Sequence, residues 1–195
     1  MKYTENWYGQ ANSCDETGYL HPDPEKAKAL IAEYGKPVAV TYYHTPSNRG
    51  RETGEILQQM LKPIGVTVTL VPNDWAAITR RLFSKDYDIA TWGIPGTDEI
   101  EPYTMAQFHS ESSWNVTRYS SPEVDKLLLD QRMSTDPEAR KATFCKIARQ
   151  VNHDAPFLYL CAPVFYAFAH TDLKNLPEWR YGFLNLADVW IDRPK

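Results

Sequence analysis

Residues 66–93, VTVTLVPNDWAAITRRLFSKDYDIATWG, decide the fold. Val66–Val71 alternates β-branched residues and predicts a strand. Asp74 is a suitable N-cap for the helix that follows, which carries apolar residues at helical spacing. Tyr87–Gly93 then predicts a second strand. A strand, a helix and a strand in this order indicate two parallel strands joined by a helical crossover.

The chain before this unit continues the same alternation. Asp23 and Pro24 predict the start of a helix, and Gly35 predicts its end. Pro37–His44 is apolar and β-branched and predicts a strand, and Arg51–Leu61 has the apolar spacing of a helix. The order α-β-α-β-α-β predicts an α/β fold, with a mostly parallel sheet flanked by helices.

The chain after this unit is predicted to be helical and then less regular. Ser121 and Asp136 each precede a Pro-Glu pair and predict the starts of two amphipathic helices. Pro156–Cys161 and Val164–Ala169 are rich in apolar and aromatic residues and predict two further strands. Residues 171–195 are predicted to be mostly loop.

Composition narrows the class of protein. The 195 residues are 43 % hydrophobic and 24 % charged, which is ordinary for a globular chain. Lys and Arg number 21 against 25 Asp and Glu, for a net charge of −4, and a mildly acidic chain argues against nucleic-acid binding. The sequence contains no apolar run long enough to predict a membrane-spanning helix.

The three cysteines form no metal or redox motif. Cys14, Cys145 and Cys161 lack C-x-x-C spacing, and none is paired with histidines at zinc spacing. A disulfide between Cys14 and Cys145 is compatible with the sequence, which leaves that pairing open.

The breaker-rich loop after the last predicted strand of the unit, residues 93–102, is the first candidate binding site. In open α/β sheets, ligands gather outside the carboxyl ends of the strands. Aromatic side chains at such places stack on sugars, peptide planes or cations, although core packing would also explain them. The predicted ligand-binding residues are Trp75, Trp92, Gly93, Ile94, Thr97, Asp98, Glu99, Tyr103 and His44.

The sequence lacks the usual catalytic motifs. It contains no H-E-x-x-H, P-loop, G-x-G-x-x-G or G-x-S-x-G motif. Asp98, Glu99 and Glu101 form a carboxylate cluster, which would serve a glycosidase-like hydrolase only at a fixed separation and is more typical of a solvated surface. His44 and His109 could share a metal, but histidines bonded to backbone groups are the commoner case. We therefore expect no catalytic residue, metal or cofactor.

A series of short motifs in order resembles one family. Residues 23–35, DPEKAKALIAEYG, are followed by QQML at 58–61, by YDIA at 87–90, by YSSPEVD at 119–125 and by DPEAR at 136–140. Together these motifs are similar to the family 5 extracellular solute-binding proteins, the dipeptide-, oligopeptide- and nickel-type binding proteins of ABC importers. Each motif is weak alone, and their order from about Pro22 to Asp192 carries the resemblance.

The resemblance implies a non-enzymatic binding protein, periplasmic or lipid-anchored, that captures a solute between two lobes and delivers it to ABC permease subunits. Members are longer than this chain, so it is expected to be one lobe that lacks the larger N-terminal lobe and the export signal. On this basis, residues 1–22 are an irregular N-terminal segment, 23–170 an α/β solute-binding lobe of the type II periplasmic binding protein kind, and 171–195 a segment returning to the missing lobe.

The resemblance also bears on the solute. Trp75 matches a tryptophan that faces the cleft in peptide-binding members. Those members follow the third strand with G-W-x-x-D, whereas this chain has Ile94 in place of the tryptophan and Asp98 one position later than the acid. Peptide-like and small polar or sugar-like solutes both stay open. A glycosidase-like hydrolase using the acidic loop, and a sensor or interaction module with the same fold, are the alternative functions.

Overall fold

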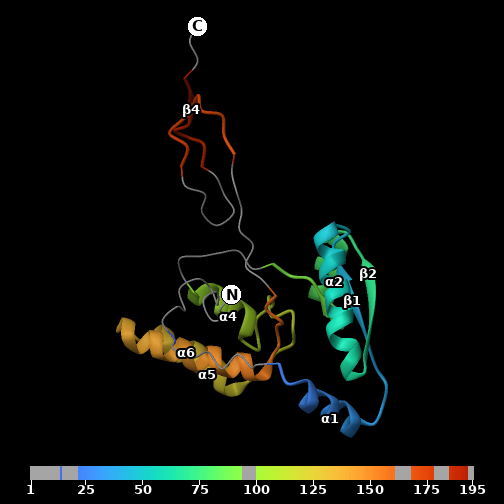
Figure 1. Ribbon diagram of the computed structural model, residues 1–195. Helices are drawn as coiled ribbons and strands as arrows, with labels where there is room; N and C mark the ends of the chain where they lie inside the picture. The colour runs from blue at the N-terminus through green and yellow to red at the C-terminus, as the bar shows by residue number, and fades with distance from the viewer. Residues whose placement is uncertain (1–13, 15–21, 94–99, 161–167, 178–184, 193–195) are drawn as a thin grey trace.

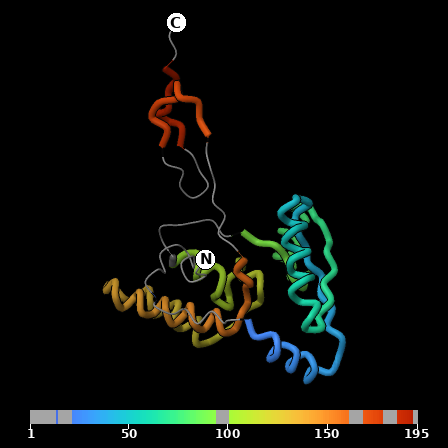
Figure 2. The backbone as a smooth tube through the Cα atoms, in the orientation of Figure 1, coloured from blue at the N-terminus to red at the C-terminus, as the bar shows by residue number. Residues whose placement is uncertain are grey.

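A computed structural model describes residues 14, 22–93, 100–160, 168–177 and 185–192. Figure 1 shows three parts: an α/β unit that contains β1, β2 and α2, a helical unit that contains α4, α5 and α6, and a hairpin near the C-terminus that projects away from both. The tube in Figure 2 follows the chain through the parts in that order.

The α/β unit is built on a three-stranded parallel sheet. The strands are β1 (Val38–His44), β2 (Val66–Pro72) and β3 (Ile89–Ala90), in the order β2-β1-β3. The register pairs Val38 with Val66 and Tyr42 with Ile89. The predicted α/β fold with a parallel sheet is therefore confirmed, although the last strand is only two residues long.

Helices lie on both faces of this sheet, but only one face is largely covered. On one face α2 (Asn48–Leu61) encloses Tyr42, Leu57 and Val68. On the other face α3 (Trp75–Ser84) buries Ile78 and Leu82. This arrangement follows from the sequence, because β2 alternates apolar residues with threonines: Val66, Val68 and Leu70 face α2, whereas Thr67 and Thr69 on the opposite face stay exposed.

Two glycines bring α2 unusually close to the sheet. A Cβ added to Gly50 would lie 2.3 Å from the Thr45 carbonyl oxygen, and one added to Gly54 would lie 2.8 Å from Leu70 Cδ2. The helix begins three residues before the predicted start, because the Ser47 side chain caps it by accepting a hydrogen bond from the Gly50 N–H group.

The predicted first helix is confirmed as α1 (Pro24–Tyr34). The Asp23 carboxylate accepts from the Lys26 N–H group at 2.9 Å, and Gly35 ends the helix at a φ of 69°. No residue of α1 is buried, so the helix covers little of the sheet. The 3-10 helix η2 (Lys62–Ile64) follows α2 and leads through Gly65, at a φ of 90°, into β2.

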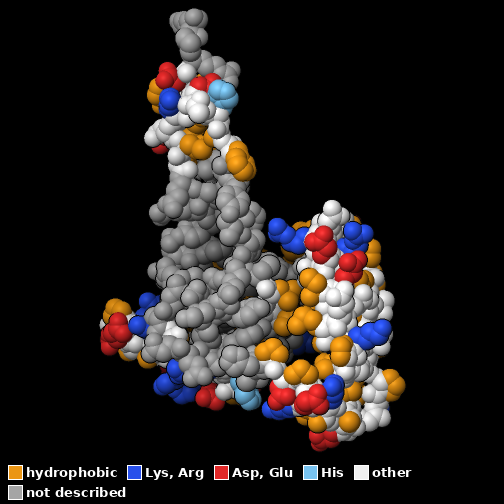
Figure 3. Space-filling view, viewed as in Figure 1, with side chains coloured by type: hydrophobic (Ala, Val, Ile, Leu, Met, Phe, Trp, Pro, Cys, Tyr) orange, Lys and Arg blue, Asp and Glu red, His pale blue; other side chains and the backbone are white. Residues whose placement is uncertain are grey.

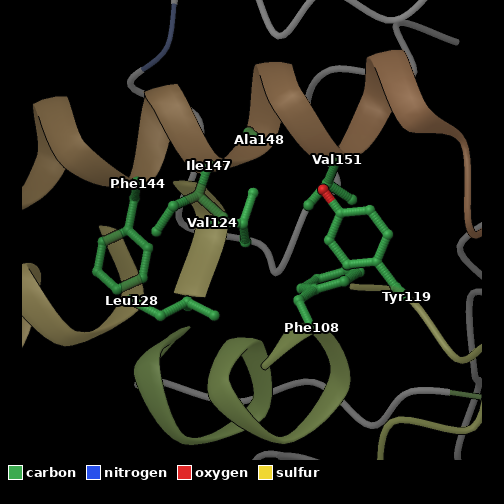
Figure 4. Close-up of a cluster of buried hydrophobic side chains, with 8 residues drawn as sticks. All are labelled: Phe108, Tyr119, Val124, Leu128, Phe144, Ile147, Ala148 and Val151. Carbon is green, nitrogen blue, oxygen red and sulfur yellow. The ribbon is translucent and has the colours of Figure 1, made fainter. Parts of the chain in front are cut away.

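The helical unit consists of α4 (Ile100–Phe108), α5 (Pro122–Met133) and α6 (Pro137–Asp154). As predicted, α5 is capped by Ser121 and α6 by Asp136. Figure 4 shows how the three helices and the loop before α5 direct apolar side chains toward one another. The buried cluster contains Phe108, Tyr119, Val124, Leu128, Phe144, Ile147, Ala148 and Val151.

Two sequence predictions in this region are wrong. Residues 100–102 were expected to be loop, but they form the first turn of α4, in which proline is tolerated because early helical N–H groups lack intrahelical partners. Residues 156–160 were expected to be a strand and form none. Their side chains Phe157 and Tyr159 pack on the helical core instead. The predicted strand Val164–Ala169 lies mostly outside the described residues.

The last described segment is an antiparallel hairpin of β4 (Leu173–Lys174) and β5 (Trp190–Ile191).

A disulfide between Cys14 and Cys145 joins the N-terminal region to α6, with a Cα–Cα distance of 5.6 Å. The pairing that the sequence left open is thus present in the structure.

The two units meet at a seam beside α3. The Tyr87 hydroxyl donates to the Val116 carbonyl oxygen at 2.8 Å, and Val116 is buried against Ile78 and Leu82. Arg118 donates to the Lys85 carbonyl oxygen at 2.5 Å. The loop between α4 and α5 therefore connects the helical unit to the α3 side of the sheet.

Candidate functional site

Four aromatic side chains on the α3 side of the sheet form a continuous series, here called the aromatic row. Trp75 stacks on Trp92, with ring centroids 6.0 Å apart and planes 11° apart. Phe83 makes edge contacts with Trp92 at 6.5 Å and with Trp114 at 5.4 Å. The row thus combines α3, the end of β3 and the loop before α5.

The end of β1 places the two stacked tryptophans. The Asn73 N–H group donates to the His44 carbonyl oxygen at 2.8 Å, two residues before Trp75. The Thr91 N–H group donates to the Tyr43 carbonyl oxygen at 2.9 Å, one residue before Trp92. Because β1 lies between β2 and β3, its last carbonyls fix the chain that leads into both tryptophans.

Asn115 holds the loop that carries Trp114. The Asn115 side chain is 1 % exposed, and its amide donates to the His109 and Tyr119 carbonyl oxygens. Its oxygen accepts from the Tyr119 N–H group at 3.1 Å. A buried, fully bonded amide of this kind gives an irregular loop one preferred conformation. The backbone that carries Trp114 is therefore held in place.

The aromatic row is accessible and has few charges of its own. Trp75 is 49 % exposed, Phe83 40 % and Trp114 53 %. Large aromatic groups usually bury most of their surface, so three neighbouring ones that stay exposed make this row a candidate binding surface. The Trp92 indole nitrogen is buried and has no hydrogen-bond partner among the residues that the structure describes. The row can stack on planar or apolar groups of a ligand.

The structure brings together some of the predicted binding residues. Trp75 and Trp92 form the stacked pair, and Gly93 follows with open space where a side chain would stand. Tyr103 lies on α4 and packs against the helical core. The predictions on Ile94, Thr97, Asp98 and Glu99 fall outside the described residues.

His44 lies apart from the aromatic row, on the α2 face of the sheet. It is 4 % exposed, stacks on Tyr42 and makes a 2.8 Å hydrogen bond with the Thr45 carbonyl oxygen through Nδ1. A histidine that is enclosed and bonded in this way supports α2, and no described group of three or more metal-ligating side chains includes it.

The acidic cluster proposed for hydrolysis is partly engaged elsewhere. Glu101, at the start of α4, forms an ion pair with Arg132 of α5. Its carboxylate therefore joins two helices, while Asp98 and Glu99 lie outside the described residues.

A pocket of about 170 Å³, open to solvent, lies at the seam between the two units. Lys85, Arg118 and Asp88 contribute its charges. Lys85 is the C-cap of α3, and Arg118 donates to its carbonyl, so these cations face the negative end of a helix dipole. The pocket is therefore explained as part of the joint between the units.

Sequence reasoning missed one member of the aromatic row and undervalued another. Phe83 was predicted only as a helical residue, although it lies eight positions after Trp75 and thus near the same side of α3. Trp114 is also absent from the predicted set. Its place depends on the Asn115 hydrogen bonds, which no local motif announces.

Among the described residues, no helix combines the length and the apolar content that are needed to cross a membrane.

A family model described as bacterial extracellular solute-binding proteins, family 5 Middle, matches residues 2–115.

The chain is 28 % identical to the periplasmic oligopeptide-binding protein OppA of Escherichia coli over 165 residues, covering 82 % of the chain and 29 % of OppA. It is 25 % identical to di/tripeptide-binding protein 2 of Pseudomonas aeruginosa, covering 85 % of the chain and 32 % of that relative. The chain spans about a third of the length of the curated relatives it matches.

Solved structures agree with the sequence matches. The ABC transporter substrate binding protein CtaP from Listeria monocytogenes superposes with a TM-score of 0.61 at 29 % identity, covering 68 % of this chain and 28 % of CtaP. The unliganded open form of the murein tripeptide binding protein MppA superposes with a TM-score of 0.63 at 19 % identity, covering 78 % of this chain and 34 % of MppA. The second likeness concerns the fold alone.

Proposed function

The chain belongs to the bacterial extracellular solute-binding proteins of family 5, and we propose that it forms one lobe of the substrate-binding component of an ABC importer. In this proposal, the lobe supplies one wall of a cleft that captures a solute for delivery to permease subunits. The family consists of binding proteins, and the proposed role involves no covalent step.

The aromatic row is the observation that carries this proposal. Trp75, Phe83 and Trp114 remain between 40 % and 53 % exposed although they contact one another or a shared tryptophan. A single wall of a cleft would look like this, because a ligand and a second lobe would cover its apolar groups only on closure.

The second lobe is inferred from length and from the C-terminal hairpin. The chain corresponds to about a third of its curated relatives. Trp190 and Ile191 in β5 are 54 % and 58 % exposed, and Figure 1 shows the hairpin standing away from the rest of the chain. We propose that residues 23–170 form the lobe and that residues 171–195 pack on the other lobe.

The solute is proposed to be a peptide or a small polar molecule. OppA and di/tripeptide-binding protein 2 are peptide-binding proteins by name. An aromatic wall suits a peptide, because it can stack on peptide planes and side chains without reading one sequence. The departure from G-W-x-x-D at Ile94 argues that the ammonium group of a peptide is held differently here.

The proposed location is the periplasm or the outer surface of the membrane, with or without a lipid anchor. The Cys14–Cys145 disulfide supports this placement, because structural disulfides form and persist in oxidising compartments. Several relatives carry the word periplasmic in their names.

Titration calorimetry with trialanine tests the half-cleft. The 195-residue chain alone should bind with a dissociation constant weaker than about 1 mM, because half of the contacts are missing. Joined to the second lobe, it should reach the micromolar range, and Trp75→Ala should then weaken binding by about tenfold or more. Met133→Ala, at an 86 % exposed position on α5, is the matched control. Micromolar binding by the lone chain would contradict the proposal.

A further inference from the structure

Arg81 joins three separate parts of the α/β unit through one guanidinium group. Its central carbon lies 4.3 Å from the centre of the Tyr43 ring in β1. Its Nε donates to Asn73 Oδ1 at 3.3 Å, in the turn before α3. Its Nη1 donates to Asp86 Oδ2 at 2.7 Å, in the turn after α3. The side chain therefore connects both ends of α3 to the middle strand of the sheet.

We propose that Arg81 is a positioning residue for the aromatic row: it fixes the placement of α3 on β1 and thereby keeps Trp75 stacked on Trp92. The inference rests on the proposed function only in assigning the row to solute binding. Its structural part concerns the Trp75–Trp92 geometry and can be tested without any solute.

The contacts of Arg81 suit this role better than a general role in stability. The apolar hold of α3 on the sheet comes from Ile78 and Leu82, which are 0 % and 2 % exposed. These residues keep α3 in place when the guanidinium is removed. The turn before the helix is held by polar contacts instead: the Asn73 N–H group donates to the His44 carbonyl oxygen, and Asn73 Oδ1, two residues before Trp75, accepts from Arg81.

A guanidinium is the side chain that this position requires. It is planar and presents several N–H donors in a rigid fork, so it can lie on the Tyr43 ring and bond to two acceptors at once. A lysine ammonium can keep the ion pair with Asp86 or approach the Tyr43 ring, but it cannot span to Asn73 as well. Arg81→Lys should therefore have an intermediate effect.

The test uses the circular dichroism couplet that two stacked indoles produce, measured on the 195-residue chain and assigned by its loss in Trp75→Phe. Arg81→Met, which keeps the aliphatic stem, should reduce the couplet at least about twofold, and Arg81→Lys should reduce it less. Arg80→Met, at the neighbouring exposed arginine, should leave it unchanged. Far-UV spectra below the melting temperature establish that each variant is folded.

A full couplet in folded Arg81→Met would overturn the inference. Should Arg81→Met fail to fold, Arg81→Lys and Asn73→Leu decide by the same couplet, and an unchanged signal in both overturns it. In the two-lobed protein, Arg81→Met should weaken trialanine binding by about tenfold, and Arg81→Lys should recover part of it. If the unsubstituted protein fails to bind trialanine, the peptide form of the proposed function fails, whereas the couplet still decides the role of Arg81.

Discussion

The helical unit and the α/β unit treat their aromatic residues in opposite ways. In the helical unit, Phe108 is fully enclosed, and Tyr119 and Phe157 meet its ring edge-on. In the α/β unit, Trp75 and Phe83 make comparable ring contacts yet stay half exposed. Figure 3 shows hydrophobic side chains gathered on the visible surface of the α/β unit.

This difference separates aromatic groups that stabilise the fold from aromatic groups that stay available at the surface. Buried aromatic groups contribute free energy of folding in proportion to the apolar area removed from water. Exposed ones contribute little until something covers them. The helical unit therefore contributes more of the stability, and the α/β unit leaves apolar aromatic area uncovered on its surface.

The largest effect is expected from removing the disulfide that ties the helical unit to the N-terminal region. Cys14 and Cys145 are 131 positions apart, and closing a loop of that length is worth about 5 kcal/mol in the chain-entropy model. The double change to alanine should lower the free energy of unfolding by up to that amount. Hydrogen exchange should show the loss chiefly in α6. Cys161→Ala is the matched control, and equal losses in β1 and α6 would contradict the division into two units.

The second prediction contrasts one buried and one exposed aromatic residue. Phe108→Ala should cost about 3–5 kcal/mol, because it opens a cavity in a core where the ring is 0 % exposed. Trp114→Ala, at 53 % exposure, should cost less than about 1 kcal/mol. Urea unfolding of both variants gives the two values. Similar losses of stability in the two variants would contradict the distinction between stabilising core aromatics and exposed surface aromatics.

The third prediction tests how tightly the α/β unit is packed on its α2 face. Gly50→Ala would place a Cβ 2.3 Å from the Thr45 carbonyl oxygen, so backbone must move, and we expect a loss of about 1–3 kcal/mol. Gly93→Ala meets open space and should change stability by less than about 0.5 kcal/mol. The melting temperatures of Gly50→Ala and Gly93→Ala measure this difference in stability. An unchanged melting temperature in Gly50→Ala would contradict the prediction.

The smallest effect concerns acid stability of the helical unit. Hydrogen bonds from His153, Tyr119 and Gln150 lower the pKa of Asp154 below its ordinary value of 3.8, against the opposing effect of burial. The folded state therefore binds this proton less readily than the unfolded state. The stabilisation is present above about pH 4 and is lost as pH falls further.

Asp154→Asn keeps an acceptor for the Tyr119 hydroxyl but removes this titration. Its free energy of unfolding should fall less steeply between pH 5 and pH 2 (roughly the range over which such carboxylates titrate) than that of the unsubstituted protein. Urea unfolding at several pH values gives both slopes. Parallel slopes would show that Asp154 does not contribute to acid sensitivity.

Much of the fold could be predicted because its helices begin with local signals. Asp23, Ser121 and Asp136 each cap a helix with their own side chain, next to a proline in the first turn. The first turn of α4 was not predicted, because Pro102 and its neighbours are residues typical of loops. Further along α4, Thr104 and Gln107 are polar yet buried, so the helix lacks a clear apolar pattern. Burial of that kind depends on tertiary contacts.

The candidate site was predictable only in part, for a related reason. Trp75 and Trp92 follow strands, so the rule for parallel sheets located them, but their stacking depends on the carbonyls at the end of β1. The aromatic strand predicted at 156–160 failed because strand formers need a neighbouring strand, and Phe157 found the helical core instead. The residue types thus indicated which side chains could stack or pack. Tertiary contacts determine which side chains they meet.

The span between Cys14 and Cys145 also sets a time order for biogenesis. Cys14 leaves the ribosome first, and its partner follows only after 131 further residues have been added. The Cys14 thiol must stay reduced, or be released from a wrong partner, until α6 has been made. The disulfide on the helical unit can therefore form only late, after the sheet, α2 and α3 have already emerged.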